Sequence, residues 1–130
     1  KNMEKSNVFR DEQINYINKS ISYLKEKIDN PTFYLWSNDL DNIDMSVFNS
    51  QIIKIHHNYE MILDIDKRSL DLFLISQCNH HIVIPSSFNW WGAWLCNKDN
   101  KIICRPDDNF FSTFKINNLD FWPDSWIKIS

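Results

Sequence analysis

One segment constrains the fold of this chain more than any other. Residues 81–84 (HIVI) read as a buried strand, and residues 88–95 (FNWWGAWL) read as a short helix. Only Pro85, Ser86 and Ser87 separate them, so the strand runs through a small-hydroxyl turn into a helix whose first backbone N–H groups are free. This arrangement predicts an anion site of the type that nucleotide phosphates use.

Strand-like and helix-like segments alternate along the rest of the chain. In the clearest helix, isoleucine and leucine recur at steps of three and four residues and make one apolar stripe. The aromatic tail over residues 110–126 is expected to be irregular. This order predicts an α/β fold with a parallel sheet and helices on both faces. We expect helices over residues 11–28 and 68–78, and strands over residues 32–36, 52–55 and 101–104.

The composition fits a single globular domain with one core. The chain has 130 residues, and its net charge of −3 leaves no broad basic surface, so no nucleic-acid partner is expected. No apolar run approaches the roughly 20 residues that a membrane-spanning helix needs, and the polar N-terminus lacks the pattern of a signal peptide. We therefore expect a soluble segment without membrane contact, and its cellular location stays open.

Cysteine and histidine spacing predicts no metal centre. Cys78, Cys96 and Cys104 are odd in number and lack paired short spacings, so reduced, mostly buried thiols are expected. The histidine pairs at residues 56–57 and 80–81 lie beside strands, where consecutive side chains point to opposite faces. Neither pair is expected to bind one ion.

The single glycine of the chain, Gly92, excludes a glycine-rich phosphate cradle. Any phosphate must then be bound by hydroxyl groups and by the N–H groups of a helix N-terminus. Ser86 and Ser87 suit this role, because each brings a hydroxyl and a backbone donor to the positive end of the helix dipole. The alternative is that one of the serines only caps the helix.

A second polar group follows the strand over residues 32–36. Ser37, Asn38 and Asp39 stand at its carboxyl end, which is where ligands bind to a doubly wound sheet. The serine turn at residues 85–87 holds the equivalent position after its own strand. Position and chemistry thus agree at both candidate sites.

Asp71 is the conspicuous polar residue of an otherwise apolar helix. That helix, over residues 68–78, is expected to pack between neighbours. An unpaired carboxylate would be costly there, so Asp71 should have a partner. The partner is either structural, such as Arg68 or a backbone amide, or the paired donors of a guanine edge, and the pattern leaves both open.

Trp90, Trp91 and Trp94 recur at helical spacing. This favours packing over stacking on a ligand. Gly92 and Ala93 lie between them and would let the helix approach the sheet closely.

Four stretches resemble motifs of one enzyme family, and they follow in the same order. Residues 85–95 (PSSFNWWGAWL) resemble the N-S-[ST]-F-S-W-W-G-A-W-L motif of alpha-1,2-fucosyltransferases, which form glycosyltransferase family 11. Residues 33–41 (FYLWSNDLD) are similar to F-x-[IF]-F-S-D-D-[IL]-x-W, and residues 70–78 (LDLFLISQC) to D-L-x-L-M-S-x-C. Residues 121–129 (FWPDSWIKI) resemble the closing P-x-x-W-x-x-I. The resemblance therefore covers nearly the whole chain.

The resemblance implies a GT-B fold whose C-terminal, Rossmann-like half binds GDP-fucose. It implies inverting transfer of fucose to a glycan hydroxyl with no required metal or other cofactor. Carried over residue by residue, Ser86, Ser87 and Phe88 would contact the diphosphate, and Asp71 the guanine. Residues 37–39 would border the nucleotide pocket, where Asn38 replaces an aspartate, and Asn42 stands where the family usually has tryptophan.

One family motif, H-x-R-R-G-D, is absent. The only arginines are Arg10, Arg68 and Arg105, and none has that context. Charge that develops on the leaving diphosphate needs a positioned cation. We therefore expect residues 1–130 to be the donor-binding portion of a longer enzyme, inactive by itself, with the acceptor site and catalytic residues in a missing N-terminal half.

Two other functions stay open. Asp39-Leu40-Asp41 matches the D-x-D signature by which another glycosyltransferase architecture binds a divalent metal, which would make the protein a metal-dependent transferase. The six tryptophans and nine phenylalanines would alternatively form a non-catalytic, carbohydrate-binding platform.

Overall fold

The computed structural model describes most of the chain, and every structural statement below concerns the described part. The chain divides into two compact units, residues 1–64 and 65–130, and each unit is described by itself. The described residues are 10–37, 39–55, 67–108 and 121–130.

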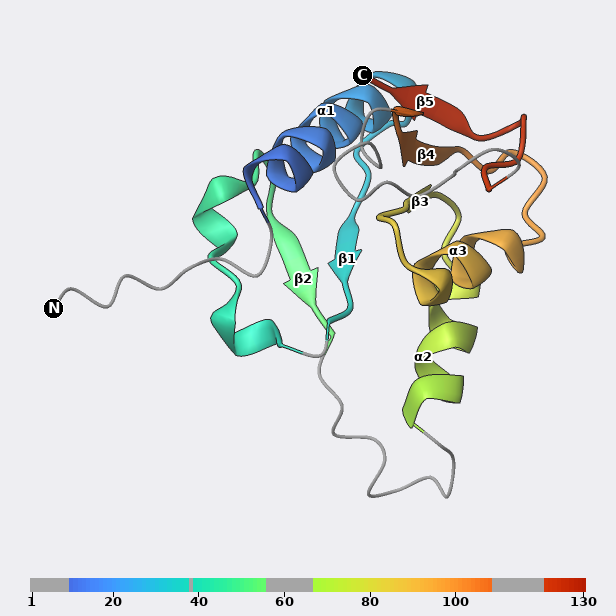
Figure 1. The fold of residues 1–130 in the computed structure, drawn as a ribbon, viewed down its shortest axis with the longest axis horizontal. Helices are drawn as coiled ribbons and strands as arrows, with labels where there is room; N and C mark the ends of the chain where they lie inside the picture. Colours follow the sequence, from blue (N-terminus) through green and yellow to red (C-terminus); the bar gives the residue numbers. More distant parts are fainter. Residues whose placement is uncertain (1–9, 38, 56–66, 109–120) are drawn as a thin grey trace, which may run out of the picture. The chain divides into compact units, whose positions relative to one another are not determined.

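The first unit contains one long helix and a two-stranded parallel sheet (Figure 1). In β1 and β2, Phe33 pairs with Ile52 and Leu35 with Lys54. Acidic residues at the start of α1 and lysines in its last turn complement the helix dipole. The elements are α1 (Asp11–Lys27), β1 (Phe33–Leu35), the 3₁₀ turns η1 (Leu40–Asn42) and η2 (Met45–Val47), and β2 (Ile52–Lys54).

The apolar stripe predicted for α1 is confirmed, because Ile21 and Leu24 are buried and Ile14 and Ile17 are half-buried. Tyr16 is also buried on this helix. Ser20 is also fully buried on α1, where its hydroxyl donates to the backbone oxygen of Tyr16 at 2.9 Å and so remains satisfied. Asn18 connects α1 to η2, because its amide donates to Val47 O at 2.9 Å.

The second unit contains two helices and a three-stranded parallel sheet in the order β3-β4-β5 (Figure 1). In the central strand β4, Ile103 pairs with His81, and Cys104 pairs with Ile127 on the other side. All strand pairs in both units are parallel, so the predicted α/β class with parallel strands is confirmed. The elements are α2 (Lys67–Ser76), β3 (His81–Ile82), α3 (Ser87–Trp94), β4 (Ile103–Pro106) and β5 (Ile127–Ile129).

The core of the second unit forms between α3 and the sheet. Ala93 of α3 is fully buried, and Trp90 packs against the same cluster and donates its indole N–H to Phe121 O at 2.6 Å. Trp94 stacks on Trp90, with ring centroids 5.3 Å apart, but stays half exposed, as does Trp91. The packing predicted for the tryptophans thus holds fully only for Trp90. The buried cluster consists of Val83, Ala93, Ile103, Trp122 and Trp126.

Several local predictions are corrected. Strand β5 was not predicted: residues 127–129 follow the tail and pair with the edge of β4, whereas residues 121–126, the described part of the tail, are irregular as expected. Strand β4 begins two residues later than expected and includes Arg105 and Pro106. Helix α2 is not enclosed by neighbours, since Phe73 is 57% exposed. Within the described ranges, no helix is both long and apolar enough to cross a membrane.

The thiols agree with the sequence prediction. Cys96 and Cys104 are buried, Cys78 is partly buried, and all three are free. Burial, and to a smaller degree the nearby Cys96, raises the pKa of the Cys78 thiol. A neutral thiol is therefore the stable form at this position.

Candidate functional site

The turn between β3 and α3 places Ser86 at the N-cap of the helix. Its backbone is extended, and its Oγ accepts hydrogen bonds from the backbone N–H of Asn89 at 3.1 Å and from Asn89 Nδ2 at 2.7 Å. Ser86 therefore caps the helix, and its predicted ligand contact remains a prediction. Because both bonds use the oxygen as acceptor, the hydroxyl proton is still available to donate to a ligand.

The first turn of α3 also offers a backbone donor. Trp90 N–H bonds to Ser86 O at 3.0 Å, and Asn89 N–H is capped by the Ser86 side chain. The N–H of Phe88 has no hydrogen-bond partner in the described part of the chain. This free donor lies at the positive end of the helix dipole, which favours an anion. Ser87 begins the helix, but its side chain lies outside the description, so its predicted contact remains a prediction.

Asp71 lies on the face of α2 that packs against α3. It stands one turn before Ile75 on the same helix. Ile75 in turn contacts Gly92 of α3, where its atoms are the nearest to the position of an added Cβ. Asp71 is 7% exposed, which agrees with the expectation of a buried carboxylate, and it is not without a partner. The side chain of Arg68, its suggested structural partner, lies outside the described residues.

The polar group after β1 forms a local hydrogen-bonded turn in the first unit. The backbone N–H of Asp39 donates to Ser37 Oγ at 3.1 Å, and Asn42 Nδ2 donates to Asp39 Oδ1 at 2.7 Å. Lys54 of β2 donates to Leu40 O at 2.9 Å. Asn42, which stands where the family motif has tryptophan, therefore orients the Asp39 carboxylate. Asn38 lies outside the described residues.

Metal-ligating side chains do not gather in the described ranges. No group of three or more histidine, cysteine, aspartate or glutamate residues there has the geometry of a metal site. Asp39 and Asp41, the residues of the D-x-D alternative, are both exposed. The histidines at residues 56–57 lie outside the description.

His80 and His81 contact different backbone groups. His80 Nδ1 accepts from the N–H of Ile102 at 2.9 Å, and His81 Nε2 lies 2.7 Å from Ile75 O. Burial lowers the pKa of His81, although its bond to Ile75 O opposes the shift. A smaller degree of burial also lowers the pKa of His80. Both rings therefore favour the neutral form and connect β3 to its neighbours.

Comparison with known proteins decides the family. The sequence profile of glycosyltransferase family 11 matches residues 1–130. The chain belongs to glycosyltransferase family 11. This membership confirms the resemblance that the four motifs suggested, and with it a place among the glycosyltransferases.

Curated relatives of this family 11 chain are sugar transferases of bacteria and mammals. It is 32% identical to an alpha-1,2-colitosyltransferase of Escherichia coli over 88% of this chain, and 27% identical to the O-antigen biosynthesis glycosyltransferase WbnK of the same species over 89%. It is 26% identical to galactoside alpha-(1,2)-fucosyltransferase 1 of Rattus norvegicus over 88%. The matched regions cover 38%, 36% and 30% of these three proteins, respectively. No solved structure matches.

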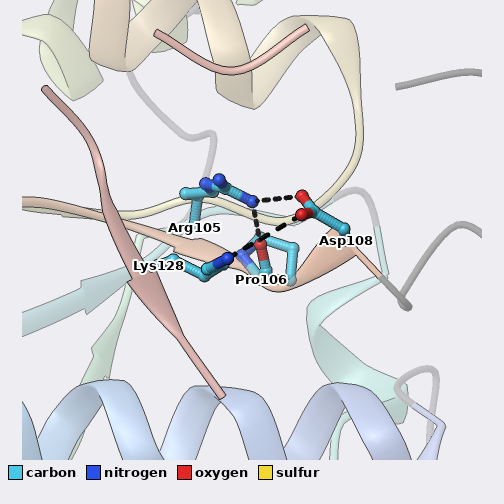
Figure 2. Close-up of polar contacts among 4 residues, drawn as sticks. All are labelled: Arg105, Pro106, Asp108 and Lys128. Atoms are coloured by element: carbon cyan, nitrogen blue, oxygen red, sulfur yellow. Dashed lines mark hydrogen bonds and ion pairs between the residues drawn. The ribbon is translucent and has the colours of Figure 1, made fainter. Parts of the chain in front are cut away.

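One polar cluster of this family 11 chain was not singled out by the sequence. Figure 2 shows Arg105 of β4 with Asp108 and Lys128: Arg105 Nη1 donates to Asp108 Oδ1 at 2.9 Å and to Pro106 O at 3.0 Å. Lys128 Nζ lies 3.8 Å from Asp108 Oδ2. The hydrogen bond from Arg105 is the main cause of a lowered pKa of the Asp108 carboxyl. The available signal was a basic residue that directly follows an apolar strand segment.

Proposed function

We propose that this chain forms the nucleotide-sugar binding portion of an inverting alpha-1,2-fucosyltransferase that takes fucose from GDP-fucose. The observation that supports it best is the N-terminus of α3, where the Ser86 hydroxyl proton and the N–H of Phe88 are unused donors after a parallel strand. Membership of glycosyltransferase family 11 supplies the reaction class.

The proposed chemistry needs these donors at the leaving group. When the bond between the fucose anomeric carbon and the diphosphate breaks, negative charge develops on the diphosphate oxygens. Donors fixed before the reaction stabilise this charge without reorganising. In an inverting transfer the acceptor hydroxyl attacks from the opposite face of the sugar, so its base and binding groups belong to another part of the protein.

Asp71 would select the base of the nucleotide. A guanine presents two neighbouring N–H donors that one carboxylate can accept, whereas uracil presents only one N–H at its pairing edge. The carboxylate is buried on α2, the helix that packs against α3 through Ile75 and Gly92. Burial strengthens its hydrogen bonds and makes the wrong base costly.

Calorimetric titration of the full-length protein with GDP, UDP and GDP-fucose tests this function. We expect GDP to bind in the presence of a chelator and UDP to bind more weakly. Asp71→Asn should weaken GDP binding, because an amide places a donor opposite a guanine donor, and Ser86→Ala should weaken it about 2- to 10-fold. Ser50→Ala, in the first unit, is the matched serine control. Preference for UDP with manganese would overturn the proposal in favour of the Asp39 and Asp41 metal site.

A second donor sugar is favoured by one relative. The 32% identical protein of Escherichia coli is named a colitosyltransferase, so transfer of a colitosyl group is the alternative reaction. The same diphosphate and guanine contacts would serve either donor. Transfer assays with the GDP derivatives of both sugars, on one galactoside acceptor, distinguish the two reactions.

A further inference from the structure

Arg105 lies at the same edge of the sheet as the serine turn. It belongs to β4, whose neighbour β3 runs parallel and leads into Ser86. The ladder continues past β3, because the N–H of Val83 bonds to Cys104 O at 2.9 Å, and this places Val83 beside Arg105. Ser86 follows only three residues after Val83. The carboxyl ends of both strands therefore meet where the proposed diphosphate site lies.

The side chain of Arg105 also lies on the correct face of the sheet. Alternate residues of a strand share a face, so Arg105 lies on the side of Ile103, which packs in the core with Ala93 of α3. The guanidinium carbon is 5.7 Å from the ring centroid of Trp122, a residue of that same core. Its two partners, Pro106 O and Asp108, follow it in the chain, so the guanidinium reaches beyond the end of β4.

The guanidinium has donors to spare. Its hydrogen bonds to Pro106 O and Asp108 both use Nη1, whereas Nε is buried without a hydrogen-bond partner and Nη2 makes no hydrogen bond to a described residue. The Nη2 group carries two N–H donors, and charge-assisted hydrogen bonds from a guanidinium to phosphate oxygens are strong. Arg105 thus has Nη1 anchored while its Nη2 donors are unused.

We propose that Arg105 is an anion-binding residue of the donor site and that its unused Nη2 donors bind a phosphate group of the nucleotide. This inference rests on the proposed function, because it takes the ligand to be the diphosphate bound at the N-terminus of α3. It adds a full positive charge to a site that otherwise offers only neutral donors. It also assigns a cation to the donor-binding portion itself.

Asp108 reduces the net positive charge at Arg105. Its carboxylate is 63% exposed, accepts from Arg105 Nη1 and lies near Lys128, so it fixes the guanidinium and offsets part of the local positive charge. Asp108→Asn would keep an oxygen acceptor for Nη1 while removing the negative charge. An anion at the Nη2 group of Arg105 should then bind more tightly.

The test is titration of the full-length protein with GDP, inorganic diphosphate and guanosine. Arg105→Gln should weaken GDP and diphosphate about 10- to 100-fold and leave guanosine unchanged, because a charged contact is lost. Arg105→Lys should recover only part of the affinity. Asp108→Asn should tighten diphosphate binding about 2- to 5-fold, a gain that misfolding would not produce. Lys98→Gln removes one positive charge of the same unit and should change little.

The outcomes separate this inference from the proposed function. If wild type binds GDP but every Arg105 variant binds it equally well, Arg105 is only structural and the inference is wrong, while the proposed function stands. If wild type binds diphosphate through Arg105 but shows no preference for GDP, the anion site stands and the GDP-fucose proposal fails. If wild type binds neither ligand, both are overturned.

Discussion

Gly92 of α3 lies directly against Ile75 of α2. A Cβ atom added to Gly92 would stand 2.5 Å from Ile75 Cγ2 and 3.3 Å from Ile75 Cβ. The sequence suggested that Gly92 lets α3 approach the sheet, but Ala93 faces the sheet and Gly92 faces the other helix. The only glycine of the chain therefore sets the distance between the helix of the serine turn and the helix of Asp71.

Gly92→Ala should destabilise the fold for this reason. Overpacking costs about 1–3 kcal/mol, which exceeds the gain of up to about 1 kcal/mol in helix propensity. Chemical denaturation measures the loss. The double variant Gly92→Ala, Ile75→Ala, compared with Ile75→Ala alone, should show a smaller penalty, because Cγ2 at 2.5 Å is gone and only Cβ at 3.3 Å remains. An equal penalty in both backgrounds would contradict the contact.

Two substitutions of Ser86 distinguish its role as the helix N-cap from its proposed role in anion binding. Ser86→Ala should lower the free energy of unfolding by about 1 kcal/mol, because the N-cap acceptor is lost. Ser86→Asp should restore this stability, since aspartate is an equally good N-cap. It should nevertheless abolish GDP binding, because a carboxylate then stands where the diphosphate belongs. Thermal melts and titrations of the two variants check this, and retained GDP binding in Ser86→Asp would place the diphosphate elsewhere.

Sequence patterns sufficed where the signal was local. The stripe on α1, the strand and helix around Ser86, and the parallel pairing of strands follow from periodicity and from short turns. Strand β5 was missed, because its three residues gain their structure by pairing with β4 and not from their own pattern. The contact of Gly92 with α2 was missed for the same reason. A helical pattern indicates which residues are apolar, but it does not indicate which neighbouring element each residue contacts.

The candidate site remains a prediction. Ser86 was singled out in the sequence because a helix N-terminus is a local feature, and Phe88 because of the family resemblance. Arg105 was not, because its importance comes from the register between β3 and β4 and from its bonds to Pro106 and Asp108. Such residues are visible in a sequence only as isolated charges beside an apolar segment.

Trp90 should be the tryptophan of α3 on which stability depends most. Its indole N–H bonds to Phe121 O, and its ring stacks on Trp94 and contacts Trp126. Trp90→Phe should cost about 1–3 kcal/mol, because a part-buried hydrogen bond and part of the ring packing are lost. Trp91→Phe is the matched control and should cost less than about 1 kcal/mol, since that ring is half exposed. Equal losses in denaturant titrations would contradict the hydrogen bond.

His81 should make stability depend on pH. Burial lowers its pKa in the folded state below the ordinary value of 6.5, and that of His80 shifts the same way. The unfolded chain therefore takes up a proton first as the pH falls, so the free energy of unfolding is highest above about pH 6.5 and declines below it. His81→Gln can still donate to Ile75 O but cannot titrate. Urea titrations between about pH 7.5 and 5.5 should show a shallower decline for His81→Gln than for wild type. An unchanged slope would show that the His81 pKa is not lowered by folding.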